Sequence, residues 1–272
     1  MTTAAPSTTA EPTVLFAHEG TIAILTLNRP ASLNSFTRQM HRDLWAALDK
    51  VEANKSIRAL VLTGAGRAFC AGADLSEFDF RAGDDIMFRA DPGPVIDQAF
   101  NPTTRRLMAV RVPTVCAVNG VAAGAGASVA MACDIAIAAP GASFIQAFSK
   151  IGLVPDSGGT WLLPQRVGLA RAMALAMTGD KLGALEAKAM GMIWDVADDA
   201  VAAAKAMAEK LAAMPTKALV RTRQAMHAAP GHTLEQQLSF EGGFMRELGW
   251  SPDYAEGVAA FMEKRAPKCT GE

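Results

Sequence analysis

Short apolar stretches and one amphipathic stretch alternate through the first quarter of the chain. Residues 14–17 (VLFA) and 21–27 (TIAILTL) flank the turn dipeptide Glu19-Gly20, which predicts a β-hairpin. Apolar side chains then recur every three or four residues from 40 to 51, which is the period of one face of a helix. Residues 59–63 (ALVLT) form a further apolar run and predict a buried strand.

The same order of elements returns further along the chain. Residues 114–118 (TVCAV) predict a strand, 124–132 a helix of small residues, and 134–139 (DIAIAA) another strand. Strands that alternate with helices predict an α/β fold. The polar, turn-rich segment 76–110 separates the two units, and a stretch of this length inside a compact domain is usually functional or mobile. We therefore expect a mobile lid there.

Helical periodicity dominates the chain beyond residue 168. Helices are expected over 169–178, 185–190, 200–214, 217–228, 234–248 and 253–264, with a strand only near 194–196. We divide the chain into a core over 14–200 and a C-terminal helical region over 201–272. Residues 1–13 carry a single charged side chain and few large apolar residues, so a disordered tail is expected.

Composition narrows the class of protein. The chain is 50% hydrophobic and 19% charged, which is typical of a folded globular protein. With 26 basic and 27 acidic residues it has no basic excess, so nucleic acid is not the expected partner. Cys70, Cys116, Cys133 and Cys269 are far apart and form no metal-binding motif, so we expect reduced thiols, no metal site and a cytoplasmic location.

Two membrane signals are missing from the pattern. The longest apolar stretch, 112–139, is interrupted by proline, glycine and aspartate and does not resemble a span of about 20 apolar residues. The first residues lack the basic start and apolar centre of a secretory signal. We therefore expect no membrane partner.

Three glycine-rich segments each follow an apolar strand: 62–75, 118–134 and 152–161. Glycine permits tight turns and lets a ligand approach backbone N–H groups. A single segment of this kind is ordinarily a turn, but three in one chain indicate a site. N–H groups at a strand end and a helix start can hold a carbonyl oxygen that becomes an enolate. The small residues at 71–73 and 123–127 leave room for an acyl group beside them.

Such a site also needs a side chain that moves the proton. Asp156 stands among uncharged neighbours, and burial there would raise its pKa towards the range useful for proton transfer. The competing interpretation makes Asp156 a helix cap whose side chain accepts from Gly158 or Gly159. Spacing alone favours the helix cap, so the sequence context must decide between the two. The four histidines lie outside the three segments and are interpreted as surface or core residues.

Seven blocks of sequence, taken in order along nearly the whole chain, resemble the enoyl-CoA hydratase/isomerase (crotonase) superfamily. These blocks are NRPASLNSF, LTGAGRAFCAGADL, AVNGVAAGAGAS, FSKIGLVPDSGGTWLLP, MTGDKL, GMIWDV and YAEGVAAFMEKRAP. The resemblance implies a crotonase-like α/β fold, with a ββα spiral core and a C-terminal helical trimerisation region. It also implies assembly as a homotrimer or a dimer of trimers.

The resemblance assigns roles to individual residues. The N–H groups of Ala73 and Ala125 match the oxyanion hole of the family. The two catalytic glutamates of the hydratases fall on Ser128 and Phe148, which are not carboxylates and make simple hydration doubtful. Asp156 matches the proton-transfer aspartate of the isomerases of phenylacetate degradation, the group within the family that the chain resembles most.

Coenzyme A is placed by the same resemblance, as part of the substrate and not as a separate cofactor. Five residues match positions that line the adenosine and pantetheine: Ser32, Leu33, Ala71, Asp74 and Leu75. Phe261 and Lys264 match residues of the C-terminal helix that reach the nucleotide end, often from a neighbouring subunit. Cys269 departs from the aromatic residue that many members carry.

The implied activity is an isomerisation of an acyl-CoA. Asp156 would shift a 3,4 double bond to the 2,3 position, or assist conversion of a ring 1,2-epoxide to an oxepin. Two alternatives keep the fold, namely an enoyl-CoA hydratase and an aryl-acyl-CoA dehalogenase in which Asp156 is the nucleophile. A further alternative is an RNA-binding homologue, which the near-neutral charge disfavours.

Overall fold

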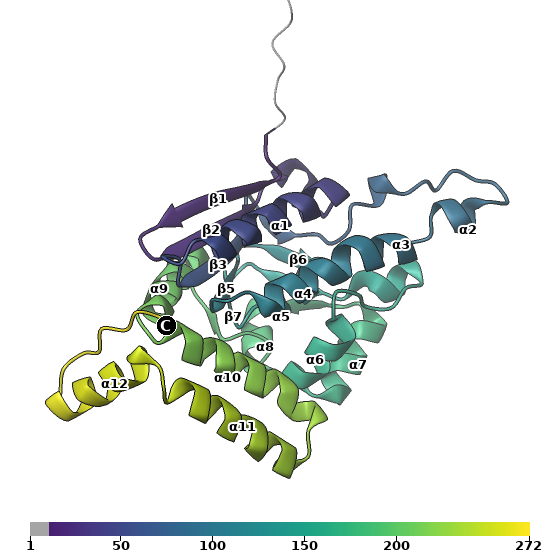
Figure 1. Cartoon of the computed structure of the whole chain (residues 1–272). Coiled ribbons are helices and arrows are strands. Elements are labelled where there is room, and N and C mark those ends of the chain that lie inside the picture. Colours follow the sequence, from purple (N-terminus) through teal and green to yellow (C-terminus); the bar gives the residue numbers. More distant parts are fainter. Residues whose placement is uncertain (1–10) are drawn as a thin grey trace, which may run out of the picture.

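A computed structural model describes residues 11–272 of the protein (Figure 1). Residues 1–10 of the expected tail lie outside the described residues. Thr13, also assigned to the tail, makes defined contacts: its carbonyl oxygen accepts from the N–H of Asn28 at 2.7 Å, and its hydroxyl donates to Asp43 at 2.6 Å. Defined contacts are therefore present before the first strand.

The predicted hairpin and first helix are confirmed. Strands β1 (Val14–Glu19) and β2 (Ile22–Leu27) pair in antiparallel register. Helix α1 (Arg38–Ala53) begins where the hydroxyl of Thr37 accepts from the N–H of Met40 at 3.1 Å. Its apolar stripe is buried as the spacing predicts, with Met40 and Leu44 fully inaccessible.

The strands form two sheets, and consecutive strands along much of the chain go to different sheets. The larger sheet has the order β1-β2-β3-β5-β7-β10 and is parallel from β2 onwards. The smaller sheet has the order β4-β6-β8-β9. The remaining strands of the larger sheet are β3 (Ala59–Gly64), β5 (Thr114–Val118), β7 (Ile135–Ala138) and β10 (Asp195–Val196). Those of the smaller sheet are β4 (Ala68–Cys70), β6 (Val121–Ala123), β8 (Ser143–Ile145) and β9 (Lys181–Gly183).

The chain thus passes from the larger to the smaller sheet three times, through β3–β4, β5–β6 and β7–β8. Two of these passages, β3–β4 and β5–β6, lie within predicted glycine-rich segments. The smaller sheet was not predicted, because strands of three residues are too short to show an alternating pattern.

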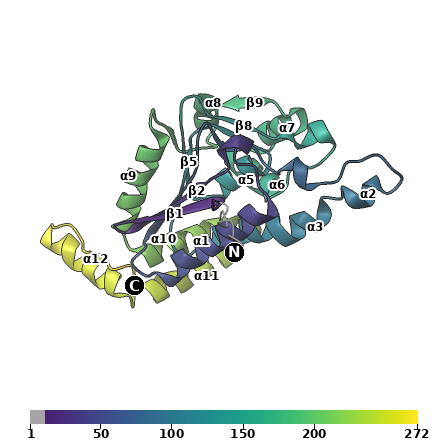
Figure 2. The same cartoon turned by 90° about the horizontal axis from the view of Figure 1, so that it is seen from above.

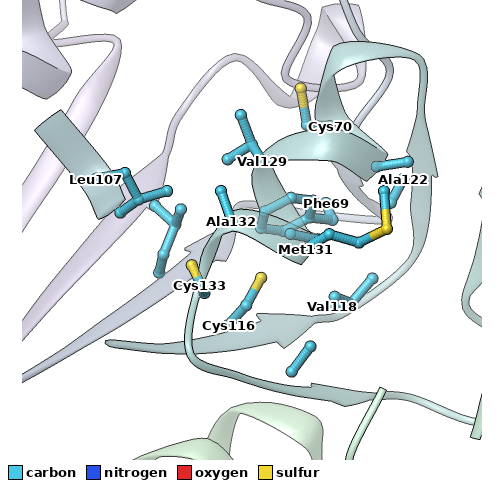
Figure 3. Close-up of a cluster of buried hydrophobic side chains, with 14 of the residues drawn as sticks. Phe69, Cys70, Leu107, Cys116, Val118, Ala122, Val129, Met131, Ala132 and Cys133 are labelled. Carbon is cyan, nitrogen blue, oxygen red and sulfur yellow. The ribbon is translucent and has the colours of Figure 1, made fainter. Parts of the chain in front are cut away.

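Helices cover both faces of the larger sheet (Figure 2). On one face, α9 (Ala200–Ala212) buries an alanine every four residues against Ile24, Val61 and Ala117. On the other face lie α1, α4 (Asn101–Ala109) and α5 (Ala125–Ala132), with Phe69 and Met131 in the core between the sheets (Figure 3). Because α9 packs on the core, the outlying C-terminal helices begin at α10 and not at residue 201.

The segment 76–110 divides into two unlike halves. Its first part projects from the body of the protein with α2 (Ile86–Arg89) near its tip (Figure 1). Its second part passes through α3 (Gly93–Val95) and a π-helical turn (Ile96–Phe100) into α4. The turn-rich pattern of 76–110 does not predict this half correctly, because α4 is regular and packed. Two of its buried positions are threonines, so the sequence does not show an apolar stripe.

Five of the remaining helices agree closely with the predicted ranges: α7 (Leu169–Thr178), α8 (Ala184–Ala189), α10 (Thr216–Ala228), α11 (Leu234–Leu248) and α12 (Pro252–Glu263). Helix α6 (Gly159–Val167) was not predicted, because it starts within the third glycine-rich segment. Figure 1 shows α11 and α12 at the periphery of the molecule. No helix within residues 11–272 combines the length and the apolar character needed to cross a bilayer.

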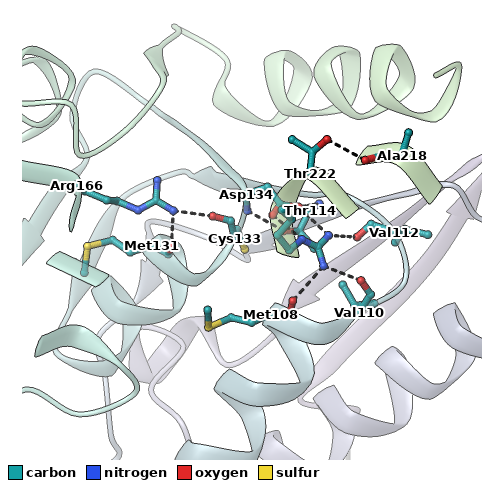
Figure 4. A network of polar contacts seen from close by, with 11 residues as sticks. Met108, Val110, Val112, Thr114, Met131, Cys133, Asp134, Arg166, Ala218 and Thr222 are labelled. Atoms are coloured by element: carbon teal, nitrogen blue, oxygen red, sulfur yellow. Dashed lines mark hydrogen bonds and ion pairs between the residues drawn. The ribbon is translucent and has the colours of Figure 1, made fainter. Parts of the chain in front are cut away.

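Buried arginines tie the later helices to the strands (Figure 4). Arg166 of α6 donates to the carbonyl oxygens of Met131 and Cys133 at 2.5 and 2.9 Å. Arg223 of α10 donates to the carbonyl oxygens of Val110 and Val112 at 2.7 and 2.6 Å. These carbonyl groups lie at the end of α5 and in the segments that precede β5 and β7, outside the hydrogen bonds of the sheet. The arginines therefore donate to acceptors that would otherwise have no partner.

Candidate active site

Two glycine-rich loops lie side by side at the ends of β4 and β6. Gly72 has φ +96, and a Cβ atom there would lie 3.0 Å from the carbonyl oxygen of Ala123 and 3.5 Å from the nitrogen of Ala125. A Cβ atom on Gly126 would overlap the backbone of Cys70. Glycine is therefore required at both positions for the loops to approach each other.

The approach places two backbone N–H groups beside each other. Ala73 lies between Gly72, whose carbonyl oxygen accepts from Phe36 at 2.7 Å, and Asp74, whose N–H donates to Phe36 at 2.9 Å. Ala125 is the first residue of α5, where an N–H has no intrahelical acceptor. Within residues 11–272 neither the Ala73 nor the Ala125 N–H has a hydrogen-bond partner. Two such donors can hold an oxygen that gains negative charge.

The loop over residues 29–36 lies against the first of these segments. Leu33 accepts a hydrogen bond from the N–H of Ala71 at 3.0 Å, and Asp74 pairs with Arg29 at 2.8 Å. Burial acts to raise the pKa of Asp74, but hydrogen bonds from Ser76 and the charge of Arg29 outweigh it and lower the pKa. The structure thus brings the loop that carries Ser32 and Leu33 next to Ala71, Asp74 and Leu75, and their role in binding coenzyme A stays a prediction.

Asn34 was missed by the sequence analysis, although it holds this loop in place. It is fully buried and has φ +57, a left-handed conformation. Its Oδ1 accepts from the N–H of Arg29 at 2.8 Å, and its Nδ2 donates to the carbonyl oxygens of Ala65 and Ala68 at 2.9 and 2.8 Å. Asparagine between two turn-like residues was the available signal, because it tolerates this conformation better than most residues.

Phe261 and Lys264 are not brought to these loops within one chain. Phe261 is 82% exposed on α12, and Lys264 ends that helix with φ +54. The tail after α12 contacts Arg58, which precedes β3, whereas the glycine-rich loop follows β3. The two residues therefore lie at the opposite end of the strand from Ala73.

Asp156 lies on the third glycine-rich loop, just before α6. Ser157 and Gly158 have φ +51 and +79, and the N–H of Gly159 donates to the backbone oxygen of Asp156 at 2.8 Å. The carboxylate itself accepts from the hydroxyl of Ser157 at 3.0 Å. Among the described residues no side chain caps α6. The helix-cap interpretation of Asp156 is therefore wrong, because the backbone closes the turn instead.

The surroundings of Asp156 alter its acidity. Burial raises the pKa of its carboxyl group to about 6, against the opposing effect of the Ser157 hydroxyl. A carboxyl group with such a pKa can take up and release a proton near neutral pH. Its loop also lies beside α5, since a Cβ atom on Gly159 would lie 2.7 Å from the Oγ of Ser128.

Phe148 and Ser128 occupy the surroundings of the two alanine N–H groups. The Phe148 ring would lie 3.6 Å from a Cβ atom on Gly124, the residue before Ala125. Ser128 is one helical turn after Ala125 and is fully buried. An apolar ring and a hydroxyl therefore stand beside the loop of Ala125, and the segment that carries Asp156 reaches Ser128 at Gly159.

Among residues 11–272, side chains of His, Cys, Asp and Glu do not gather in threes at metal-binding distance. His41 lies in the core, stacked on Phe36 at 4.7 Å with its Nδ1 2.7 Å from the hydroxyl of Thr103. Burial lowers the pKa of its imidazole to about 4. His41 is therefore a buried core residue, as expected.

Comparison with known proteins defines the class to which this fold and these loops belong. The family model described as "Enoyl-CoA hydratase/isomerase" matches residues 17–272. The chain belongs to this family, so the resemblance seen in the sequence is confirmed. It is 49% identical over 253 residues to the 1,2-epoxyphenylacetyl-CoA isomerase of Escherichia coli (strain K12), covering 92% of this chain and 95% of that protein.

Solved structures confirm the crotonase-like fold. The enoyl-CoA hydratase from Bacillus anthracis superposes with a TM-score of 0.87 at 30% sequence identity, covering 96% of this chain and 100% of the other. The enoyl-CoA hydratase from Polaromonas sp. JS666 gives a TM-score of 0.86 at 33% identity, covering 94% and 99%. The relatives thus include proteins named as isomerases and as hydratases.

Proposed function

We propose that this protein is an acyl-CoA isomerase that moves a proton along the acyl chain next to the thioester. The N–H groups of Ala73 and Ala125 hold the thioester oxygen while it carries the charge of an enolate. The carboxylate of Asp156 takes a proton from C2 of a 3-enoyl-CoA and returns it to C4. The double bond moves from the 3,4 to the 2,3 position, and Asp156 is left unchanged.

The state of Asp156 is the observation that carries this proposal. Its carboxyl group is largely buried, does not cap α6, and has its pKa raised to about 6 by burial. A structural aspartate gains little from such a site, whereas a group that accepts and releases a proton near neutral pH needs it.

The acyl group is proposed from the relatives. The name of the E. coli relative supports a ring epoxide, 1,2-epoxyphenylacetyl-CoA, as a substrate. The same proton transfer would serve a 3-enoyl-CoA. Hydration is the second candidate, because the solved neighbours are titled enoyl-CoA hydratases. It is less well supported, because Ser128 and Phe148 provide no carboxylate to activate water.

Coenzyme A is proposed to enter with the substrate, with no other cofactor. Its adenosine and pantetheine would lie along Ser32, Leu33, Ala71, Asp74 and Leu75, and Phe261 and Lys264 of a neighbouring copy would reach the nucleotide. Assembly as a homotrimer or a dimer of trimers fits the large apolar side chains exposed on and near the outer helices. These are Met226, Leu234, Leu238, Met245, Trp250, Tyr254, Phe261 and Met262. Sedimentation equilibrium tests the assembly, and a monomer at micromolar concentration would contradict it.

Comparison of two reactions tests the proposed activity. Conversion of 3-hexenoyl-CoA to 2-hexenoyl-CoA, followed by ultraviolet absorbance of the conjugated thioester, is expected to be at least about 100-fold faster than hydration of 2-hexenoyl-CoA, because one carboxylate contributes about two to four powers of ten. Faster hydration would overturn the proposal. A covalent ester between the carboxylate of Asp156 and the ring carbon of a halogenated aryl-acyl-CoA, formed with release of halide and seen by mass spectrometry, would favour the dehalogenase alternative.

A further inference from the structure

Ser128 and Gln146 carry buried polar atoms without an obvious function. Ser128 is 0% and Gln146 4% exposed. Within the described part of the chain, the Oγ of Ser128 and both side-chain polar atoms of Gln146 have no hydrogen-bond partner. A buried polar group that is left unpaired destabilises the folded protein, so these unpaired atoms indicate that a polar group binds there.

The two side chains flank one backbone position. A Cβ atom on Gly159 would lie 2.7 Å from the Oγ of Ser128 and 3.7 Å from the Oε1 of Gln146. The side chains of Ser128 and Gln146 therefore lie close to each other. They contact the same glycine-rich segment that carries Asp156, three residues before Gly159. The third neighbour of this position is Pro155, whose Cβ would be 3.0 Å away, so the pair stands next to an apolar wall.

The same pair is connected to the loop of Ala125. Ser128 lies one helical turn after Ala125 on α5, so the two residues share a face of that helix. Gln146 follows Ile145, whose carbonyl oxygen accepts from the N–H of Gly124 at 2.8 Å. Ser128 and Gln146 thus lie where the loop of the alanine N–H groups meets the loop of Asp156.

From this position we infer that Ser128 and Gln146 form a binding site for an oxygen atom on the acyl group, an inference that rests on the proposed function. A hydroxyl and a primary amide both donate and accept, so together they match a hydroxyl, an epoxide or a ring ether. A plain hydrocarbon chain leaves both side chains unpaired. A site built on buried polar groups discriminates strongly against a ligand that lacks the matching group. The pair therefore selects acyl-CoA substrates that carry an oxygen.

A binding measurement with unreactive ligands tests this selection. Isothermal titration calorimetry compares phenylacetyl-CoA with 2-, 3- and 4-hydroxyphenylacetyl-CoA. At least one hydroxylated ligand is expected to bind the natural protein about tenfold more tightly than phenylacetyl-CoA, which corresponds to one good hydrogen bond of about 1.4 kcal/mol. In Ser128→Ala and in Gln146→Met this advantage is expected to fall below about twofold.

Two controls show whether a lost ligand preference is due to Ser128 and Gln146 themselves. Ser239→Ala changes an exposed serine of α11 and is expected to retain the tenfold preference. Thermal unfolding of each variant shows that it is folded, and Gln146→Met keeps the size of the side chain. Equal affinity of the natural protein for all four ligands would overturn the inference, as would a preference that survives both variants.

A bound water molecule could also pair with Ser128 and Gln146, and a crystal structure distinguishes it from a ligand oxygen. A crystal structure with the tightest hydroxylated ligand is expected to show its oxygen between Ser128 and Gln146. A water molecule there, with the ligand oxygen elsewhere, would contradict the inference. Because binding needs no turnover, the ligand preference can be present in a protein that fails the isomerisation assay, so failure of the proposed function is recognised separately.

Discussion

Arg223 and Asp134 form a two-pronged ion pair that joins the first C-terminal helix to the larger sheet. The Nε atom of Arg223 lies 2.7 Å from Oδ1 of Asp134, and its Nη2 atom lies 2.9 Å from Oδ2. Asp134 also accepts from the N–H of Thr114 at 2.8 Å. The Arg223 side chain is only 6% exposed, and its remaining N–H groups reach the chain between α4 and β5.

Replacement of Arg223 is expected to destabilise the protein strongly. In Arg223→Met the carboxylate of Asp134 and several carbonyl groups lose their donor, and breaking a buried pair costs about 3–5 kcal/mol. Arg221→Met is the matched control on the same helix, because Arg221 pairs with Glu247 nearer the surface and should cost less than about 1 kcal/mol. Urea unfolding measures both. Equal losses of unfolding free energy in the two variants would show that the Arg223 network stabilises the protein no more than the Arg221 ion pair does.

Asn34 provides a second test of stability. Asn34→Gly keeps the left-handed backbone at φ +57 but removes three hydrogen bonds, at an expected cost of about 3 kcal/mol. Asn34→Ala adds about 1 kcal/mol of backbone strain. Denaturant titration compares the three proteins. If alanine were tolerated better than glycine, the assigned role of the left-handed conformation would be wrong.

His41 makes stability depend on pH. Its pKa is lowered to about 4 in the folded protein, while the unfolded chain has the ordinary value near 6.5. The unfolded state therefore binds more protons below pH 6.5, and stability is lost as pH falls from about 6.5 towards 4. The loss approaches about 1.4 kcal/mol per pH unit and about 3 kcal/mol in all. Unfolding at several pH values should show this loss reduced in His41→Leu. An identical pH dependence of stability in His41→Leu would show that His41 is not the group responsible.

The raised pKa of Asp156 predicts that the proposed isomerase activity increases with pH. The carboxylate must be ionised to take the proton, and its pKa is about 6 in the free protein. We therefore expect kcat/KM for 3-hexenoyl-CoA to rise about tenfold per pH unit below 6 and to level off above about 7. Steady-state rates between pH 4.5 and 8 measure this pH dependence. Circular dichroism shows over which part of that range the protein stays folded. A profile that is flat from about 5 upwards would place the ionising group elsewhere.

Much of the larger sheet and its helices could be predicted from periodicity. Helix α11 was predicted at its observed limits, because its apolar side chains repeat with helical spacing. The smaller sheet could not be predicted, since each of its strands has only three residues and two of them, β4 and β6, lie within glycine-rich segments. Helix α4 was hidden because Thr103 and Thr104 occupy its buried face.

The candidate site, too, could be predicted from the sequence only in part. The residue patterns around Ala73 and Ala125 indicated the two loops, and the structure shows that Gly72 and Gly126 bring them together. Whether Asp156 capped a helix could not be settled by spacing, because a side chain and a backbone oxygen can both close that turn. The contacts of Asn34 were also out of reach, since they depend on carbonyl groups about thirty residues away in the sequence.

Turnover by Asp156→Asn tests the central claim most directly. The amide keeps the shape of the side chain but cannot take up the proton, so we expect kcat for 3-hexenoyl-CoA isomerisation to fall by about 100-fold or more. Binding of phenylacetyl-CoA should stay within about twofold of the natural protein, and Asp198→Asn, at an exposed position, should keep full activity. Loss of turnover with binding retained is the predicted result. Full activity in Asp156→Asn would contradict the account.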